Sequence, residues 1–129
     1  MDTSPPPPGN EPLPGTVEVE HPAPGLAVVN VTGEHDVSTA PELTQALDEA
    51  AAYSNVLVDL SECSFMDSSV IQALLTTAQS LEARGEQLAL VIPAEQGVVA
   101  RVAHMTRLSE IICIYPSRGT GLASLQPGD

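Results

Sequence analysis

VLVDLSECSFMDSSVIQALL, residues 56–75, is the stretch of sequence that decides the fold. Its first four residues, 56–59, form an apolar run that ends in an aspartate, which is typical of a strand covered on both faces. A polar loop follows, in which Phe65 and Met66 turn inward, and a helical apolar pattern begins directly after Ser69. The sequence therefore predicts a buried strand, a loop, and a helix whose first turn carries one carboxylate and two hydroxyls.

The predicted helix start at Asp67, Ser68 and Ser69 has two interpretations. A helix N-terminus presents unpaired N–H groups and about half a positive charge, so it attracts an anion such as phosphate. In the first interpretation the three residues only cap the helix, and Ser69 with Gln72 three residues later fits a capping box. In the second, one serine is a regulated phosphorylation site. The residues alone leave both interpretations open.

Strands and helices alternate along the chain after an opening pair of strands. We expect strands at 16–20, 26–31, 56–59, 87–92 and 111–115, and helices at 40–53, 69–84 and 94–105. Thr39 and Glu42 fit a capping box before the first helix, whereas Gly119 and Gly121 weaken the case for a last helix at 116–125. The order β-β-α-β-α-β-α-β(-α) predicts an α/β fold with a mixed, mostly parallel sheet of four to five strands. The opening hairpin forms its antiparallel edge.

Two acidic loops precede helices in this arrangement. One runs from 33 to 39 and contains Asp36, and the other contains Asp67 and Ser69. Loops that leave the carboxyl ends of parallel strands gather at one edge of a sheet. If the two strands before these loops are neighbours, Asp36 lies close to Asp67 and Ser69, and the three form an acidic, hydroxyl-bearing patch.

The composition limits the kinds of partner. The net charge is −13, from 17 acidic residues against 4 basic ones, all of which are arginine. Such a balance argues against nucleic-acid binding, which needs a basic face, and against docking on an anionic membrane. A basic or neutral protein partner is expected. Because aromatic residues are nearly absent, the core must be aliphatic.

The ends of the chain and its two cysteines complete the organisation. Residues 1–15 are rich in proline and predict a disordered tail, residues 16–125 form one domain, and 126–129 form a loose end. No apolar segment resembles a signal peptide or a membrane span. Cys63 is expected in a loop and Cys113 in a strand. Two cysteines make no disulfide framework, and reduced thiols in the cytoplasm are expected.

A search for catalytic chemistry finds no candidate that we adopt. The histidines His21, His35 and His104 lie far apart and lack metal-ligand spacing. Ser69 is not flanked by the glycines of a nucleophile elbow. A triad of Ser69, His35 and Asp36 is conceivable, but two adjacent residues rarely orient one another as a triad requires. We therefore predict no catalytic residue, no metal and no cofactor.

Three separated segments carry a resemblance to a known family. FMDSS at 65–69, followed by an apolar helix, resembles the signature of the STAS domain, in particular that of bacterial anti-sigma factor antagonists. GEHDVSTAPEL at 33–43 resembles the family's GELD-xx-TAPEL segment, and IYPS at 114–117 resembles its last strand. The resemblance covers most of the chain between its two ends.

The resemblance implies a protein-binding switch and not an enzyme. In such families the unmodified antagonist binds an anti-sigma factor that is also a serine kinase, and a sigma factor is released. The kinase then phosphorylates the second serine of the DSS motif, here Ser69 and less plausibly Ser68, and a phosphatase resets the switch. The partner-binding residues implied are Asp36, Asp67, Ser68, Ser69 and Val70, and the oligomeric state is left open.

One position departs from the family pattern. The family usually has glycine directly after DSS, where this chain has Val70. A β-branched side chain at this position is expected to slow or hinder the approach of a kinase to Ser69. The alternative function is therefore a STAS scaffold or interaction domain that is not phosphorylated.

Overall fold

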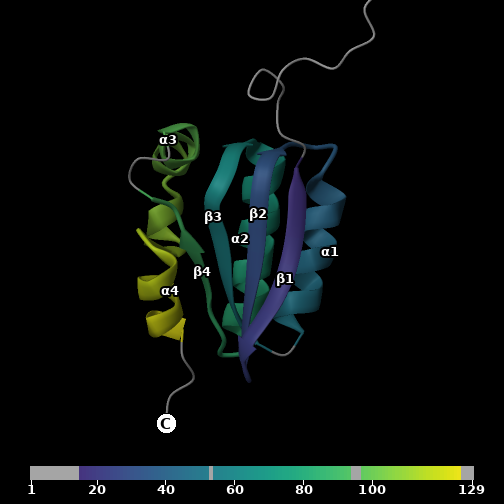
Figure 1. The fold of residues 1–129 in the computed structure, drawn as a ribbon, viewed down its shortest axis with the longest axis vertical. Helices are drawn as coiled ribbons and strands as arrows, with labels where there is room; N and C mark the ends of the chain where they lie inside the picture. Colours follow the sequence, from purple (N-terminus) through teal and green to yellow (C-terminus); the bar gives the residue numbers. More distant parts are fainter. Residues whose placement is uncertain (1–14, 53, 94–96, 126–129) are drawn as a thin grey trace, which may run out of the picture.

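The structure is a computed structural model, and it describes residues 15–52, 54–93 and 97–125. Five strands form one sheet in the order β1-β2-β3-β4-β5, in which β1 and β2 are antiparallel and the other neighbours are parallel (Figure 1). The strands are β1 (Thr16–Ala23), β2 (Leu26–His35), β3 (Asn55–Met66), β4 (Leu88–Val91) and β5 (Cys113–Tyr115). The helices are α1 (Ala40–Ala51), α2 (Ser68–Ala83), α3 (Gly97–Met105), the short 3-10 helix η1 (Leu108–Glu110) and α4 (Arg118–Leu125). The predicted α/β fold is confirmed.

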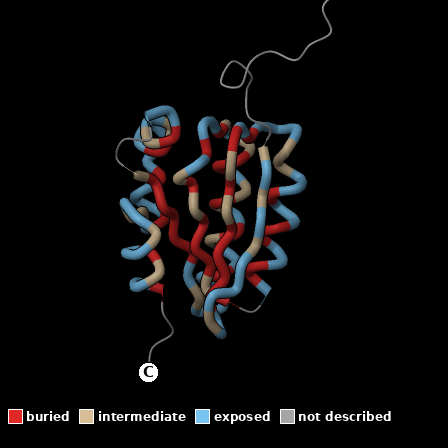
Figure 2. Tube along the Cα trace, in the orientation of Figure 1, coloured by how far each residue is buried: buried red, intermediate tan, exposed pale blue. Residues whose placement is uncertain are grey.

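Helices lie on both faces of the sheet. Helices α1 and α2 cover one face, whereas α4 packs against β3, β4 and β5 on the other (Figure 1). Helix α3 lies at the end of the sheet where the parallel strands end, and it packs against β3. The middle strands are consequently buried on both sides, as Figure 2 shows. The apolar run at 56–59 had predicted this position for β3.

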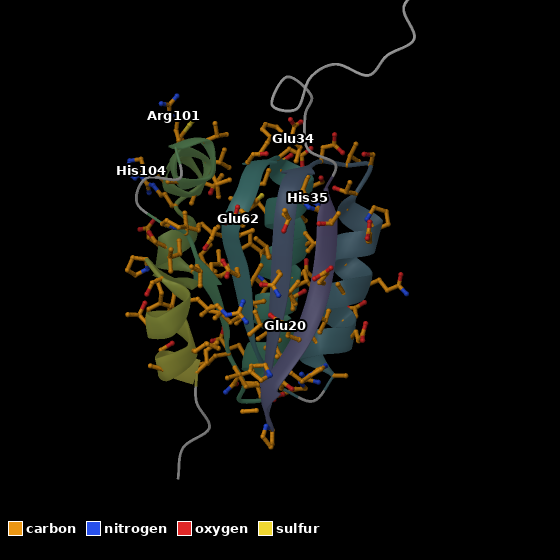
Figure 3. The ribbon with its side chains drawn as sticks, viewed as in Figure 1. Glu20, Glu34, His35, Glu62, Arg101 and His104 are labelled. Carbon is orange, nitrogen blue, oxygen red and sulfur yellow. The ribbon has the colours of Figure 1, made fainter. Side chains whose placement is uncertain are left out.

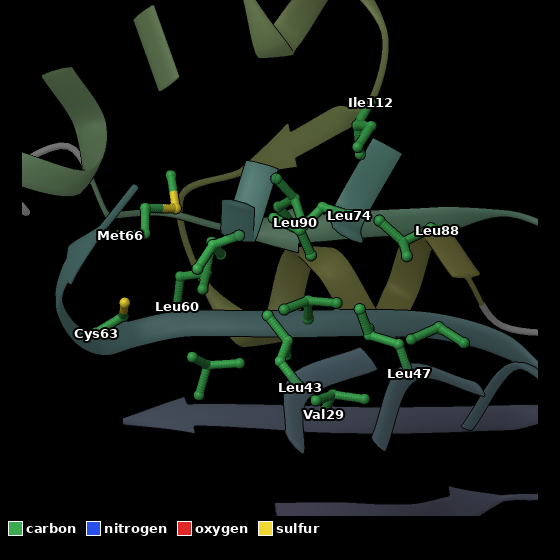
Figure 4. Close-up of a cluster of buried hydrophobic side chains, with 14 of the residues drawn as sticks. Val29, Leu43, Leu47, Leu60, Cys63, Met66, Leu74, Leu88, Leu90 and Ile112 are labelled. Atoms are coloured by element: carbon green, nitrogen blue, oxygen red, sulfur yellow. The ribbon is translucent and has the colours of Figure 1, made fainter. Parts of the chain in front are cut away.

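The core is aliphatic. Figure 4 shows part of the cluster between the sheet and its helices, in which Val29, Leu43, Leu47, Leu74 and Leu90 interdigitate. Each fully buried side chain of this size contributes about 1.5–3 kcal/mol relative to its exposed state. A smaller cluster on the other face joins the sheet to α4.

Strands β2 and β3 extend further than the sequence predicted. Their parallel pairing continues to His35 and Met66, and it passes two register shifts on the way. The predicted loop position of Cys63 is therefore wrong, because Cys63 lies within β3 and is wholly buried. Phe65 was expected to turn inward, but it is 39% exposed. The register shifts permit this departure from simple alternation.

Helix α4 forms in spite of its two glycines. A Cβ atom on Gly121 would lie 2.8 Å from Leu57 Cδ1 in β3. The missing side chain thus lets α4 approach the sheet closely. A Cβ atom on Gly119 would have no atom within 4 Å. Glycine at this position therefore destabilises α4 only through its low helix propensity.

The predicted tail and loose end lie mostly outside the described residues, which start at Gly15 and stop at Leu125. Gly15 itself is placed, against the Glu34 carbonyl oxygen and the His35 ring. The start of the predicted third helix, residues 94–96, also lies outside them. Within the described residues no helix combines the length and the apolarity needed to cross a bilayer.

Candidate functional site

Asp36 and Asp67 leave the sheet side by side. Their preceding residues, His35 and Met66, are paired across β2 and β3. The Ser69 hydroxyl and two backbone N–H groups hold the pKa of the Asp67 carboxyl below its usual range, and the negative charge of Asp36 is the weakest of the effects that oppose them. The expected proximity of the two acidic loops is therefore confirmed, and the edge of the sheet carries two carboxylates next to the start of α2.

Asp67 is the N-cap of α2. Its Oδ1 accepts hydrogen bonds from the backbone N–H of Ser69 at 2.9 Å and of Val70 at 3.3 Å. The predicted capping box of Ser69 with Gln72 is wrong, because the cap lies two residues earlier. Asp67 has extended backbone angles, which a cap residue needs and a helical serine lacks.

Ser69 donates its hydroxyl proton to the same oxygen. The distance from Ser69 Oγ to Asp67 Oδ1 is 2.5 Å. This hydroxyl is the largest cause of a lowered pKa at Asp67, and it outweighs the opposing effects of burial and of the charge of Asp36. Ser69 is partly exposed and the neighbouring Ser68 is exposed. Both hydroxyls therefore lie at the surface, but only Ser69 is held by the cap.

Val70 points into the core. Its side chain is wholly buried in the main hydrophobic cluster. Its side chain is thus not presented at the surface of the chain, and the partner-binding role implied for Val70 stays a prediction. The side chain also does not stand between solvent and Ser69.

Asp36 is held by its own turn. Its Oδ1 accepts from the backbone N–H of Ser38 at 2.8 Å and from the Ser38 hydroxyl at 2.5 Å. These bonds hold the pKa of the Asp36 carboxyl below its usual range, and the bond from the Ser38 hydroxyl has the largest effect. Thr39 occupies the N-cap position of α1, but its side chain caps no helical N–H. The predicted capping box of Thr39 with Glu42 is therefore wrong.

His35 is buried behind this turn (Figure 3). Its Nδ1 lies 3.0 Å from Thr39 Oγ1, and its Nε2 lies 3.0 Å from the Thr32 carbonyl oxygen. Both ring nitrogens are thus occupied within β2 and its turn, so the ring offers none to Ser69. Among the described residues no three His, Cys, Asp or Glu side chains come together as metal ligands.

Two exposed apolar side chains flank the carboxylates, and the sequence did not predict them as site residues. Val37, directly after Asp36, is 73% exposed, and Phe65 precedes Asp67 by two residues. Exposed apolar groups beside a polar site are a common feature of protein-binding surfaces. In the sequence, only their positions close to the two acidic residues could have indicated that Val37 and Phe65 belong to the site.

This chain is similar to known proteins of one family. The family model for the STAS domain matches residues 17–121. RsfB of Mycobacterium tuberculosis, named an anti-sigma-F factor antagonist, is 26% identical over 106 residues, which are 81% of this chain and 84% of that protein. Rv2638 of the same organism is 35% identical over 80 residues. That match spans 62% of this chain and only 53% of Rv2638.

A solved structure is similar over nearly the whole chain. The crystal structure of an anti-sigma factor antagonist from Mycobacterium paratuberculosis has a TM-score of 0.78 and 28% identity to this chain. The match covers 88% of this chain and 96% of that one. Sheet order, the capped start of α2 and the family match lead to one conclusion: this chain belongs to the STAS domain family.

Proposed function

We propose that this chain is an anti-sigma factor antagonist. In its unphosphorylated form it binds an anti-sigma factor that is also a serine kinase, and a sigma factor is released. Phosphorylation of Ser69 ends the binding, and a serine phosphatase restores it. The protein acts in the cytoplasm as a binding protein with no reaction of its own. The names and similarity of RsfB and of the Mycobacterium paratuberculosis protein support this proposal.

The observation that carries the proposal is the hydrogen bond between Ser69 and Asp67. Phosphorylation removes the hydroxyl proton that Ser69 now donates at 2.5 Å. It places about 1.5–2 negative charges beside the carboxylates of Asp67 and Asp36. A partner surface that fits the neutral Ser69 hydroxyl next to Asp67 then meets a phosphate with about two negative charges. The change is local to the partner surface, which suits a binding switch.

The alternative of an unphosphorylated scaffold was based on Val70. Its side chain is wholly buried, so a kinase that approaches Ser69 meets Asp67 and the exposed Ser68. This position of the valine weakens the steric argument for a scaffold. The alternative remains as an outcome of the following test.

The first experiment is a phosphorylation assay. The purified protein is incubated with ATP and each anti-sigma factor kinase of its source organism, and its intact mass is measured. We expect addition of one phosphate, retained in Ser68→Ala and absent in Ser69→Ala. If none of these kinases modifies the protein, the switch is refuted and the scaffold function is preferred.

The second experiment measures partner binding by calorimetry. Ser69→Asp supplies part of the phosphate charge, and we expect the affinity for the anti-sigma factor to fall at least about tenfold. Ser80→Asp is the matched control, because Ser80 is an exposed serine of the same helix at a distance from the site. Equal affinities for the two variants would contradict the assigned role of Ser69.

A further inference from the structure

The surface of α3 and η1 differs from the rest of this acidic chain. Two of the four arginines, Arg101 and Arg107, lie on it and are exposed. Arg107 pairs with Glu110 at 3.8 Å. Arg101 forms no ion pair with a carboxylate among the described residues. Arg101 therefore presents a positive charge on a protein whose net charge is −13.

The same surface exposes apolar side chains. Val98, Arg101 and Met105 lie at i, i+3 and i+7 and so share one side of α3. Val98 is 51% exposed and Met105 is 74% exposed. The opposite side of the helix, with Val99 and Ala103, is buried in the core. We call the stripe of Val98, Arg101 and Met105 the α3 face.

A cavity lies on another side of α3, next to His104, and none of the three residues of the α3 face lines it. It has a volume of about 220 Å³ and lies between α3 and the ends of β4 and β5, where Ile92 and Ile114 line it. Ala103, His104 and Ser109 complete much of its wall. The volume is below that of a typical small-molecule site. Because its lining residues are not those of the α3 face, the cavity is separate from that face.

The α3 face lies at the same end of the molecule as the candidate site. Helix α3 packs against β3, the strand that leads into Asp67. Figure 3 shows Arg101 and His104 at one corner of this end and Glu34 nearer its middle. One end of the sheet thus combines an acidic half, which contains Asp36 and Asp67, with a basic and apolar half.

We propose that the α3 face is a second docking site for the anti-sigma factor, and that its ligand is a short amphipathic acidic helix of that partner. Apolar side chains of this helix pack on Val98 and Met105, and neighbouring carboxylates face Arg101. The identity of the partner rests on the proposed function. Charge complementarity selects this ligand, because the acidic surface elsewhere repels carboxylates. Two halves of opposite charge also fix the orientation of the partner.

A defined peptide tests this inference without the anti-sigma factor. The probe is a synthetic amphipathic helical peptide with a leucine face flanked by glutamates, and the control peptide has lysine in place of each glutamate. Both are titrated into the ¹⁵N-labelled full chain and followed by NMR. We expect the glutamate peptide to shift amide signals of residues 97–111, and the lysine peptide to leave them in place.

Variants of Arg101 make the test specific. Arg101→Glu should weaken the glutamate peptide at least about tenfold, whereas Arg101→Lys, which keeps the charge, should stay within about threefold of the parent. The inference would be overturned if Arg101→Glu bound the glutamate peptide as tightly as the parent protein does. It would also be overturned if the peptide shifted amide signals outside residues 97–111. Shifts of the same residues on dilution of the protein alone would also overturn it, because the ligand would then be a second copy of the chain.

The anti-sigma factor itself provides the last comparison. If Ser69→Asp weakens its binding but Arg101→Glu does not, the α3 inference is wrong and the proposed function stands. If both weaken it, the docking site is supported. If no anti-sigma factor binds the chain, the proposed function fails, and the peptide titration alone decides whether the α3 face binds acidic helices.

Discussion

Replacement of Asp67 by alanine tests the cap on which the candidate site is built. Asp67 accepts two backbone N–H bonds at the start of α2, at 2.9 and 3.3 Å, and one bond from the Ser69 hydroxyl. Loss of an N-cap side chain costs about 0.5–2 kcal/mol. The Val70 N–H bond is long, and the partly exposed Ser69 hydroxyl can bond to water instead. We therefore expect a loss of about 1–1.5 kcal/mol, or roughly 4–6 °C in Tm for a domain of this size.

The effect of Asp67→Ala should depend on pH. The pKa of Asp67 is lowered in the folded protein, first by the Ser69 hydroxyl and then by two backbone N–H groups. A carboxyl with a depressed folded pKa stabilises the protein above its unfolded pKa, which is about 3.9. That stability is lost as the pH falls through the folded value. The difference between parent and variant should thus be constant from about pH 7 to 5 and should shrink below about pH 4.

Urea denaturation followed by circular dichroism at several pH values measures both quantities. Asp67→Asn is the matched control, because its amide oxygen still accepts backbone N–H bonds, so it should lose less than Asp67→Ala. Ser68→Ala should change stability by less than about 0.5 kcal/mol. A loss below about 0.3 kcal/mol in Asp67→Ala, or a difference that does not shrink in acid, would refute the assignment of the cap.

Three further substitutions and one chemical modification test other parts of the structure. Gly121→Ala should destabilise by about 1–2 kcal/mol, because its Cβ would lie 2.8 Å from a leucine of β3. Gly119→Ala has open space and should be neutral or stabilising in thermal melts. Val70→Gly should cost about 3 kcal/mol but leave the phosphorylation rate of folded protein within about threefold; a large rate increase would restore the steric argument. Burial raises the pKa of the Cys63 thiol to about 11, so iodoacetamide at pH 8 should modify the exposed Cys113 first, as intact mass will show.

The sheet and its helices were predictable because their apolar patterns are long. The apolar run of three residues at 56–58 correctly placed a strand with both faces covered. The far ends of β2 and β3 were not predictable, because residues 60–66 mix polar and apolar side chains across register shifts. These shifts depend on the pairing with a distant strand. For the same reason Cys63 was placed in a loop.

The candidate site shows a similar division. The proximity of Asp36 and Asp67 followed from the topology of parallel strands, which a sequence can reveal. The choice of Asp67 over Ser69 as cap could not follow from it. Both residue types are good caps, and the helix begins at one of them only because β3 continues to Met66. The inward direction of Val70 depends on the same boundary.

The cap also determines how phosphorylation would act on the fold. A phosphate at a helix N-terminus normally accepts hydrogen bonds from the unpaired N–H groups there. In this chain the Asp67 carboxylate already holds the N–H groups of Ser69 and Val70. A phosphate on Ser69 must either displace Asp67 or point outward into solvent. If it points outward, α2 keeps its cap, and the added charge acts on the partner. In that case phosphorylation of Ser69 would change partner binding and leave the helix folded.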